Sequence, residues 1–183
     1  MRKTTPAHKS KPASRSSAPG SPRAKSKSPS AALRRASVAD VREIQRLINS
    51  FADKGEMLPR SLNELYENLR DYLVLEQRGE IIGTVACHVN WEDLAEVKCL
   101  AVAEAHRGQG HGARLVQACM EEAGALGLKK LFALTYKPEF FARLGWRQVD
   151  KATLPQKIWV ECVRCVKFPD CGEVALIYDL EAT

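Results

Sequence analysis

Three glycines spaced two residues apart lie in the segment Arg107-Gly108-Gln109-Gly110-His111-Gly112 of this chain. A turn with so few side chains lets several backbone N–H groups point at one place. The apolar periodicity that follows predicts a helix, whose N-terminus adds positive potential at the same place. The spacing therefore predicts a phosphate site, and a pyrophosphate group fits it.

Two common phosphate-binding motifs do not match this loop. A Walker A motif needs Lys followed by Ser or Thr after its last glycine, whereas Ala113-Arg114 stands there. The dinucleotide fingerprint G-x-G-x-x-G fails because the glycines stand at 108, 110 and 112. The pattern that is met is Arg/Gln-x-x-Gly-x-Gly/Ala, through Arg107, Gly110 and Gly112.

This pattern resembles the acetyl-CoA loop of the Gcn5-related N-acetyltransferase (GNAT) superfamily. The resemblance implies that acetyl-CoA is the co-substrate and that the preceding strand binds its pantetheine arm through the backbone of Leu100, Ala101 and Val102. It implies that the pyrophosphate is bound by the loop residues Arg107, Gly108, Gln109, Gly110, His111 and Gly112.

The segment from Pro138 to Trp146 resembles a second signature of the superfamily. Many members carry a tyrosine where Phe141 stands, and its hydroxyl is taken to protonate the departing thiolate. Because Phe has no hydroxyl, this step falls to water, to a hydroxyl such as Thr135 or Tyr136, or to no protein acid at all.

Direct acetyl transfer needs an uncharged amine, so a general base is expected near the thioester. Glu96 is the candidate, because an acid within a central strand needs a task or a partner. On an alternating strand Glu96, Lys98 and Leu100 share one face. An ion pair or a position at the rim of the sheet is the alternative for Glu96.

The acceptor is indicated by a resemblance to short, single-domain N-acetylglutamate synthases, which covers everything except the N-terminal tail. It is carried by four segments: Gly55–Ser61, Val85–His88, Trp91–Glu96 and Leu154–Trp159. It implies transfer to the α-amine of L-glutamate, the first step of arginine biosynthesis. Leu58 and Arg60 would grip the amino acid, Glu96 would stand beside the amine, and Thr135 matches a hydroxyl position of the family.

A dicarboxylate needs two fixed cations, and Lys98 is the candidate for the second, although both cations could be ordinary surface charges.

Two alternative functions are left open. The first is the same enzyme class acting on another amine: glutamine, another amino acid, a polyamine or a protein N-terminus. The second is a function of another class, a zinc or nucleic-acid-binding module. Cys162, Cys165 and Cys171 resemble part of a zinc site, with a fourth ligand from His88, His111 or Asp170. Reduced structural thiols are favoured over metal ligands, so we expect no bound metal.

The charge is divided between two regions. Residues 1–35 hold ten of the 28 Lys and Arg and none of the 22 Asp and Glu, so the remainder is mildly acidic. Residues 1–31 are predicted to be a disordered tail, with a nucleic-acid tether or a transit peptide as functional alternatives. Residues 32–183 are predicted to form the GNAT domain, cytoplasmic and without a membrane segment, and a homodimer is left open.

The elements that must position these residues follow from periodicity and turn signals. A strand at 33–36 leads through a Ser37/Asp40 capping box into a helix whose apolar face carries Val41, Ile44 and Phe51. Further helices are expected at 61–69, 110–126 and 138–144. Further strands are expected at 71–77, 80–89, 95–102, 130–135, 157–163 and 173–180. The sum is a mixed α/β sheet of six to seven strands with helices on both faces.

Overall fold

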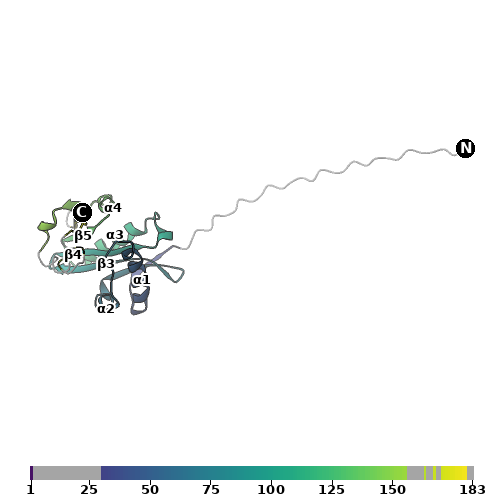
Figure 1. The fold of residues 1–183 in the computed structure, drawn as a ribbon, viewed down its shortest axis with the longest axis horizontal. Helices are drawn as coiled ribbons and strands as arrows, with labels where there is room; N and C mark the ends of the chain where they lie inside the picture. The colour runs from purple at the N-terminus through teal and green to yellow at the C-terminus, as the bar shows by residue number, and fades with distance from the viewer. Residues whose placement is uncertain (2–29, 156–162, 164–166, 168–169, 181–183) are drawn as a thin grey trace.

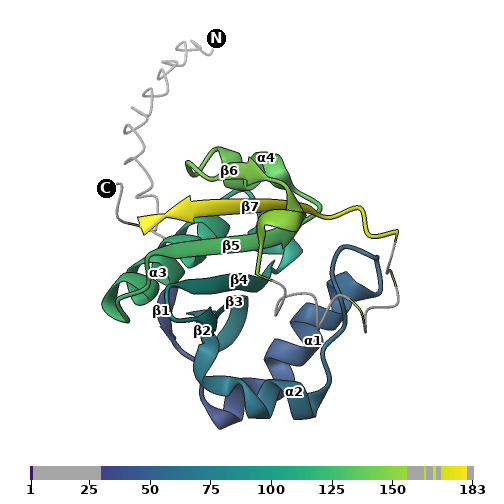
Figure 2. The same ribbon diagram turned by 90° about the vertical axis from the view of Figure 1, so that its left-hand side faces the viewer.

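The computed structural model describes residues 1, 30–155, 163, 167 and 170–180. Within these residues a seven-stranded sheet has the order β1-β2-β3-β4-β5-β7-β6 (Figure 2). The strands are β1 (Ala32–Arg35), β2 (Tyr72–Gln77), β3 (Glu80–Trp91), β4 (Leu94–Val102), β5 (Lys130–Thr135), β6 (Arg147–Val149) and β7 (Val174–Asp179). The α-helices are α1 (Val41–Ala52), α2 (Leu62–Glu67), α3 (His111–Ala125) and α4 (Pro138–Ala142). The expected mixed α/β fold is confirmed.

The start of α1 is set by Asp40, as the capping box predicted. Its carboxylate accepts hydrogen bonds from the N–H and Oγ of Ser37 at 2.6 and 2.7 Å. The guanidinium of Arg34 donates to the same carboxylate at 2.7 and 2.9 Å. These four bonds join β1 to the helix that covers one side of the site.

Left-handed backbone marks two turns of the fold. Arg78 and Gly79 have φ of 55° and 81°, as expected for a two-residue turn between antiparallel strands β2 and β3. Gly110 has φ of 80° and is the residue before α3, where a side chain would be strained.

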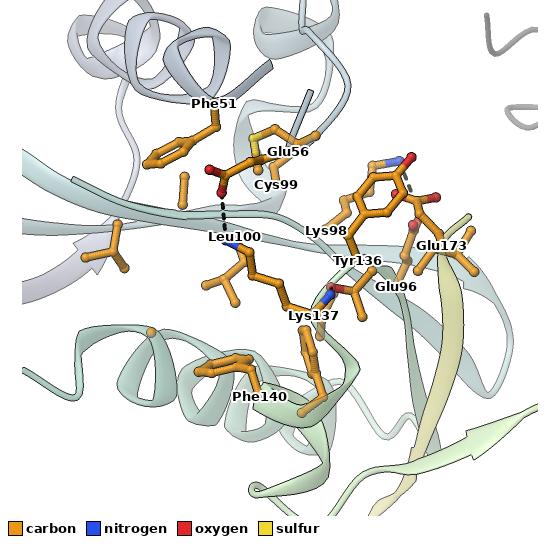
Figure 3. Close-up of a pocket in the computed structure, with 18 of the residues that line it drawn as sticks. Phe51, Glu56, Glu96, Lys98, Cys99, Leu100, Tyr136, Lys137, Phe140 and Glu173 are labelled. Carbon is orange, nitrogen blue, oxygen red and sulfur yellow. Dashed lines mark hydrogen bonds and ion pairs between the residues drawn. The ribbon is translucent and has the colours of Figure 1, made fainter. Parts of the chain in front are cut away.

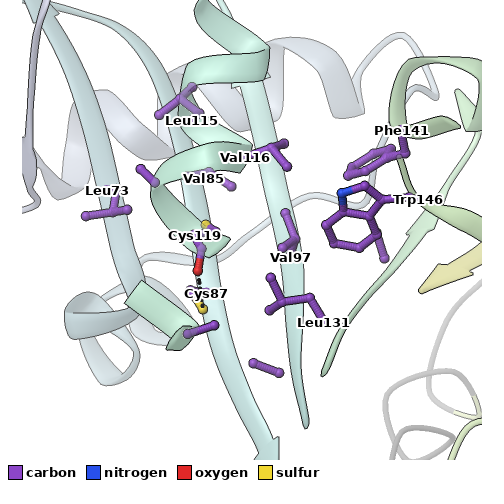
Figure 4. Packing of buried hydrophobic residues seen from close by; sticks show 14 of the residues in the cluster. Leu73, Val85, Cys87, Val97, Leu115, Val116, Cys119, Leu131, Phe141 and Trp146 are labelled. Carbon is purple, nitrogen blue, oxygen red and sulfur yellow. Dashed lines mark hydrogen bonds between the residues drawn. The ribbon is translucent and has the colours of Figure 1, made fainter. Parts of the chain in front are cut away.

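The sheet separates two apolar clusters, since α3 packs on one face and α1 with α2 on the other (Figure 1). Leu115, Val116 and Cys119 of α3 are fully buried against the sheet, among Leu73, Val85 and Val97 (Figure 4). On the opposite face the packing is made by the buried residues Val41, Ile44, Ile48, Leu65, Tyr72, Val74 and Ala86. Burying both faces leaves little freedom in the position of the central strands.

Two features of β4 open the sheet where the site lies. Its parallel register with β5 runs from Leu94↔Lys130 to Glu96↔Phe132, and beyond that point both strands line a cavity. Cys99 has φ of 54° and adds one residue to β4, because Ala86 pairs with Lys98 while Thr84 pairs with Ala101.

The bulge corrects one expectation of the sequence. Leu100 was predicted to share a face with Glu96 and Lys98, but the extra residue reverses the alternation after Lys98. Leu100 packs instead against the cluster on the α3 face, and Cys99 packs against the cluster on the α1 face.

The other differences lie at element ends and late in the chain. The helix expected at 61–69 is split into α2 and the 3-10 turn η2 (Leu69–Asp71), and β6 was not expected. Most of the strand expected at 157–163 lies outside the described residues; its last residue, Val163, is helical. Within the described residues, every helix is too short or too polar to cross a membrane.

Candidate active site

A cavity of about 830 Å³ lies where β4 and β5 separate (Figure 3). Its walls include nearly all of the residues predicted from the sequence: Leu58, Arg60, Glu96, Lys98, Leu100, Ala101, Val102, Arg107, Gly108, Gly110, His111, Gly112 and Thr135. Gln109 is the exception, since it is exposed in the loop and its Nε2 donates to the carbonyl of Ala105 at 3.4 Å. Residues far apart in the sequence therefore share one cavity.

The glycine-rich loop has the geometry expected of an anion site. Gly108 and Gly110 have φ of 73° and 80°, and no atom lies within 4 Å of the place where a Cβ would stand on either. A Cβ on Gly112 would come within 3.3 Å of the Phe140 ring, so Gly112 lets α3 pack closely against α4. The Nε2 atom of His111 is buried at the cavity wall without a hydrogen-bond partner among the described residues. The loop thus presents free N–H groups of the α3 N-terminus and a polar atom to a ligand.

Glu56 joins this loop to the opposite wall. Its carboxylate accepts from Lys137 Nζ at 2.6 Å and from Arg107 at 3.4 Å, and the Lys137 contact crosses above Leu100 in Figure 3. The hydrogen bond from Lys137 lowers the pKa of Glu56, with smaller contributions from the charges of Arg107 and Lys54. The guanidinium of Arg107 also lies 4.7 Å from the centre of the Phe51 ring. The segment after α1 is therefore tied to both sides of the cavity mouth.

Arg60 is held in the wall by its backbone. Its N–H donates to Asn49 Oδ1 at 2.9 Å, and its carbonyl accepts from Gln45 Nε2 at 3.1 Å and from Asn49 Nδ2 at 3.3 Å. The guanidinium is 16% exposed and lies 3.4 Å from Glu64, which also completes the capping box of α2 with Ser61. Both ends of the segment that carries Arg60 are thus fixed to helices.

Glu96 and Lys98 lie side by side on β4, deep in the cavity. Their charged atoms are 3.4 Å apart, and each side chain is only 13% exposed. The ion pair weighed as an alternative for Glu96 is therefore present, inside the predicted site rather than at a rim. Thr135, at the end of β5, accepts a hydrogen bond on Oγ1 from the Lys137 N–H at 3.0 Å.

The sequence missed a group of polar residues that reach the cavity from the end of the chain. Cys171 and Glu173, just before β7, line the wall near Tyr136, and Figure 3 shows Glu173 beside Tyr136 and Glu96. Lys167 Nζ donates to the Tyr136 hydroxyl at 2.9 Å. Burial raises the pKa of Tyr136 despite this contact, so the phenol stays protonated near neutral pH. Only the antiparallel pairing of β5 with β7 brings Glu173 here, and no local pattern in the sequence signals it.

Two adjacent aromatic residues of α4, Phe140 and Phe141, both line the cavity, and Phe141 also packs into the core. Phe141 is buried, with its ring 5.1 Å from that of Trp146, whereas Phe140 faces the cavity in Figure 3. Phe140 also touches the position of Gly112. Neither ring carries a hydroxyl, so neither can protonate the departing thiolate. The alternatives given by the sequence remain: water, the hydroxyl of Thr135 or Tyr136, or no protein acid at all.

The possible zinc site is only partly described. Cys162 and Cys165 lie outside the described residues, and the Sγ of Cys171 lies 3.5 Å from Glu173. Among the residues that the structure describes, no group of three or more His, Cys, Asp or Glu is placed to hold a metal ion. Of the proposed fourth ligands, His88 pairs with Asp71 at 2.6 Å.

Comparisons with known proteins show the family of this chain. Residues 38–146 match the model of the acetyltransferase (GNAT) family. An uncharacterized N-acetyltransferase from Chlorobaculum tepidum is 36% identical over 148 residues, which are 81% of this chain and 96% of the relative. An amino-acid acetyltransferase from Mycobacterium tuberculosis is 34% identical over 135 residues, 72% of this chain and 77% of the relative.

A solved structure of N-acetylglutamate synthase from Neisseria gonorrhoeae, complexed with coenzyme A and N-acetyl-glutamate, has a TM-score of 0.76 to this chain. The sequences are 27% identical, and the match covers 84% of this chain. It covers only 36% of the Neisseria chain, so the two proteins correspond over one part of the longer one.

Proposed function

This chain belongs to the acetyltransferase (GNAT) family, and from that premise we propose that L-glutamate is the amine it acetylates. The chain is an acetyl-CoA-dependent N-acetyltransferase. The product would be N-acetylglutamate, and the reaction would be the first step of arginine biosynthesis. The glycine-rich loop is assigned to the pyrophosphate and β4 to the pantetheine arm.

The observation that carries the acceptor is the group of charges in the cavity beside β4. Arg60 offers a fork of N–H donors to one carboxylate, and Lys98 offers a second cation to the other. The carboxylate of Glu96, next to Lys98, is the anion that pairs with the ammonium group of the substrate. A dicarboxylic amino acid matches two cations and one anion, and the Neisseria structure holds N-acetyl-glutamate, the acetylated form of such an amino acid.

The chemistry proposed is direct transfer in a complex with both substrates. Glu96 removes one proton from the ammonium, and the neutral amine attacks the thioester carbonyl carbon. Backbone N–H groups of β4, freed where the strand parts from β5, stabilise the resulting oxyanion. Collapse of this intermediate breaks the C–S bond. The nitrogen loses its second proton in this collapse, and the CoA thiolate takes up one proton, passed on through water or through a hydroxyl, for which Thr135 and Tyr136 both line the cavity.

The test is a screen for free CoA thiol released from acetyl-CoA with single amines. We expect release with L-glutamate well above that with glutamine, aspartate, lysine, spermidine and a peptide N-terminus. Mass spectrometry of the glutamate reaction should give N-acetylglutamate. Faster release with any other amine would overturn glutamate as the acceptor and leave the acetyltransferase assignment intact.

One observation favours a second acceptor. Glu173 adds another carboxylate to the wall near Glu96, and it would repel a second carboxylate on the substrate. Glutamine has the same length with an uncharged amide in that place. The glutamine arm of the screen separates the two.

A further inference from the structure

Proton removal leaves Glu96 with a proton that must leave the site before the next turnover. The Glu96 side chain is only 13% exposed before any substrate is present. Acetyl-CoA and an amino acid in the cavity would cover it further. A path from Glu96 to solvent that does not cross the substrates is therefore needed.

His88 on β3 is the titratable group directly opposite Glu96. The antiparallel register pairs His88 with Glu96, so both side chains project from the same face, with Cβ atoms about 4.5–5.5 Å apart. Both residues line the cavity. Direct contact or one bridging water joins side chains at such a separation.

The far side of His88 is held by an acid. Its Nδ1 lies 2.6 Å from Oδ2 of Asp71, in η2. The two side chains are 29% and 25% exposed, and both also line a second depression between η2 and the end of β3. His88 therefore forms part of the wall between the cavity and this outer depression.

The charges around His88 suit passage of a proton. An ionised Asp71 fixes the tautomer with the proton on Nδ1 and leaves Nε2 as an acceptor. Charged groups line the two spaces that His88 separates: Arg60, Glu96 and Lys98 on the side of the cavity, and Glu67, Arg70 and Asp71 on the side of the outer depression. Acids thus flank both ends of the path, and Arg60 and Lys98 lie on its cavity side.

We infer that Asp71 and His88 form a proton relay from Glu96 to solvent, a role that rests on Glu96 being the base of the proposed reaction. The protonated Glu96 gives its proton to Nε2 of neutral His88, directly or through one water, and returns to the carboxylate. His88 becomes an imidazolium that still donates its Nδ1–H to Asp71. The Nδ1 proton then passes through Asp71 to water in the outer depression, and exchange of the remaining ring proton with water restores the tautomer with the proton on Nδ1.

The experiment compares His88→Gln and Asp71→Asn with the unaltered chain in the thiol-release assay. Asp93→Asn is the matched control, because Asp93 forms a surface pair with Lys130 at 3.9 Å and lies outside the cavity lining. We expect kcat to fall about 10- to 100-fold in His88→Gln, less than the roughly 10²–10⁴-fold effect of a direct acid–base group. The KM for acetyl-CoA should change less than twofold.

Two readouts separate a relay from a structural ion pair. In His88→Ala, added imidazole should restore kcat in proportion to its concentration, and kcat of both His88 variants should rise with buffer concentration. A structural role would lower thermal stability without rescue by imidazole or buffer. Unchanged kcat in His88→Gln, or loss without rescue in His88→Ala, would overturn the relay.

The proposal that L-glutamate is the acceptor can be wrong while the proton relay is right. If another amine proves to be the substrate, the same variants are measured with that amine, since Glu96 remains the base in question. If Glu96→Gln leaves kcat unchanged, Glu96 is not the base and the relay falls with it.

Discussion

Arg60 carries a guanidinium on a backbone that is held by hydrogen bonds to α1. Three hydrogen bonds with the side chains of Gln45 and Asn49 hold its peptide groups, so little backbone ordering remains when a carboxylate binds. A flexible lysine on the surface would lose more entropy for the same contact. This anchoring is the physical reason to assign substrate recognition to Arg60.

Arg60→Ala should raise the KM for glutamate about 10- to 100-fold, because a hydrogen bond to a charged group contributes about 1.5–3 kcal/mol. The KM for acetyl-CoA should stay within twofold. Steady-state kinetics with each substrate varied in turn measures both. Arg147→Ala is the control, since Arg147 pairs with Asp179 at 3.0 Å outside the cavity. Equal increases in both KM values would count against the assignment.

The carboxylate of Glu96 lies 3.4 Å from the ammonium group of Lys98, which helps to hold it in place. Glu96→Gln keeps the shape but cannot accept a proton, so kcat should fall by about 10²–10⁴-fold. The remaining activity should rise toward high pH, because more of the amine is then uncharged. A pH series of kcat tests this, with Glu80→Gln in the exposed β2–β3 turn as control. A normal kcat in Glu96→Gln would remove Glu96 from the chemistry.

At the scale of elements, the bulge in β4 decides which side chains reach the substrate. Cys99 takes a left-handed conformation that costs a non-glycine residue about 1–2 kcal/mol. The Tyr72 hydroxyl donates to its Sγ at 3.3 Å, and burial raises the pKa of Tyr72, so the donor stays protonated. Strain of this kind at a cavity wall is typical of functional sites.

The junction of β1 with α1 gives a pH-dependent prediction. Arg34 and Ser37 hold the pKa of Asp40 well below its usual range, against the opposing effect of burial. A lowered folded-state pKa gives stability that is present above the unfolded pKa and is lost as the pH falls toward the folded one.

Asp40→Asn should therefore lower the free energy of unfolding by about 1–3 kcal/mol at pH 7. The difference from the unaltered chain should shrink as the pH falls below about 4, the usual pKa of an aspartate in the unfolded state. Urea unfolding at several pH values measures it. Asp53→Asn, at the opposite end of α1, is the control. A difference independent of pH would show that the charge of Asp40 is not responsible.

At the scale of the whole molecule, the cavity is bounded by strands that meet only at one end. β4 and β5 pair from Leu94 to Glu96 and then part, and ligand contacts to both would close the gap in the sheet. Glu56 bridges the mouth in the structure, through Lys137 and Arg107. A ligand that lies in the cavity and contacts both β4 and β5 should therefore stabilise the two strands together.

Acetyl-CoA at about 100 times its Kd should stabilise the fold by about 2.7 kcal/mol and raise the Tm by roughly 5–10 °C. Amide exchange should slow in both β4 and β5. Differential scanning fluorimetry and hydrogen–deuterium exchange measure these effects, with glutamate alone as the comparison. Protection confined to the glycine-rich loop would contradict binding along the groove.

Much of the fold could be predicted from local patterns. The capping box at Ser37 and Asp40 and the glycine-rich turn before α3 each depend on neighbours within one or two turns. Their interactions are short-range, so the residues themselves specify them. The face of Leu100 was predicted wrongly because a bulge depends on a partner strand, and strict alternation cannot reveal it.

The sequence by itself determined where the cofactor phosphates are proposed to bind, because a glycine-rich turn followed by a helix can bind phosphate through its own backbone, whatever lies around it. Only the tertiary structure decided that the side chains assigned to the proposed acceptor share one cavity, and that His88 and Glu173 lie there with them. Arg60, Glu96, His88 and Glu173 come from four segments, and long-range strand pairing and helix packing bring them to one cavity. Contacts between residues distant in sequence depend on the whole packed fold, which no local pattern encodes.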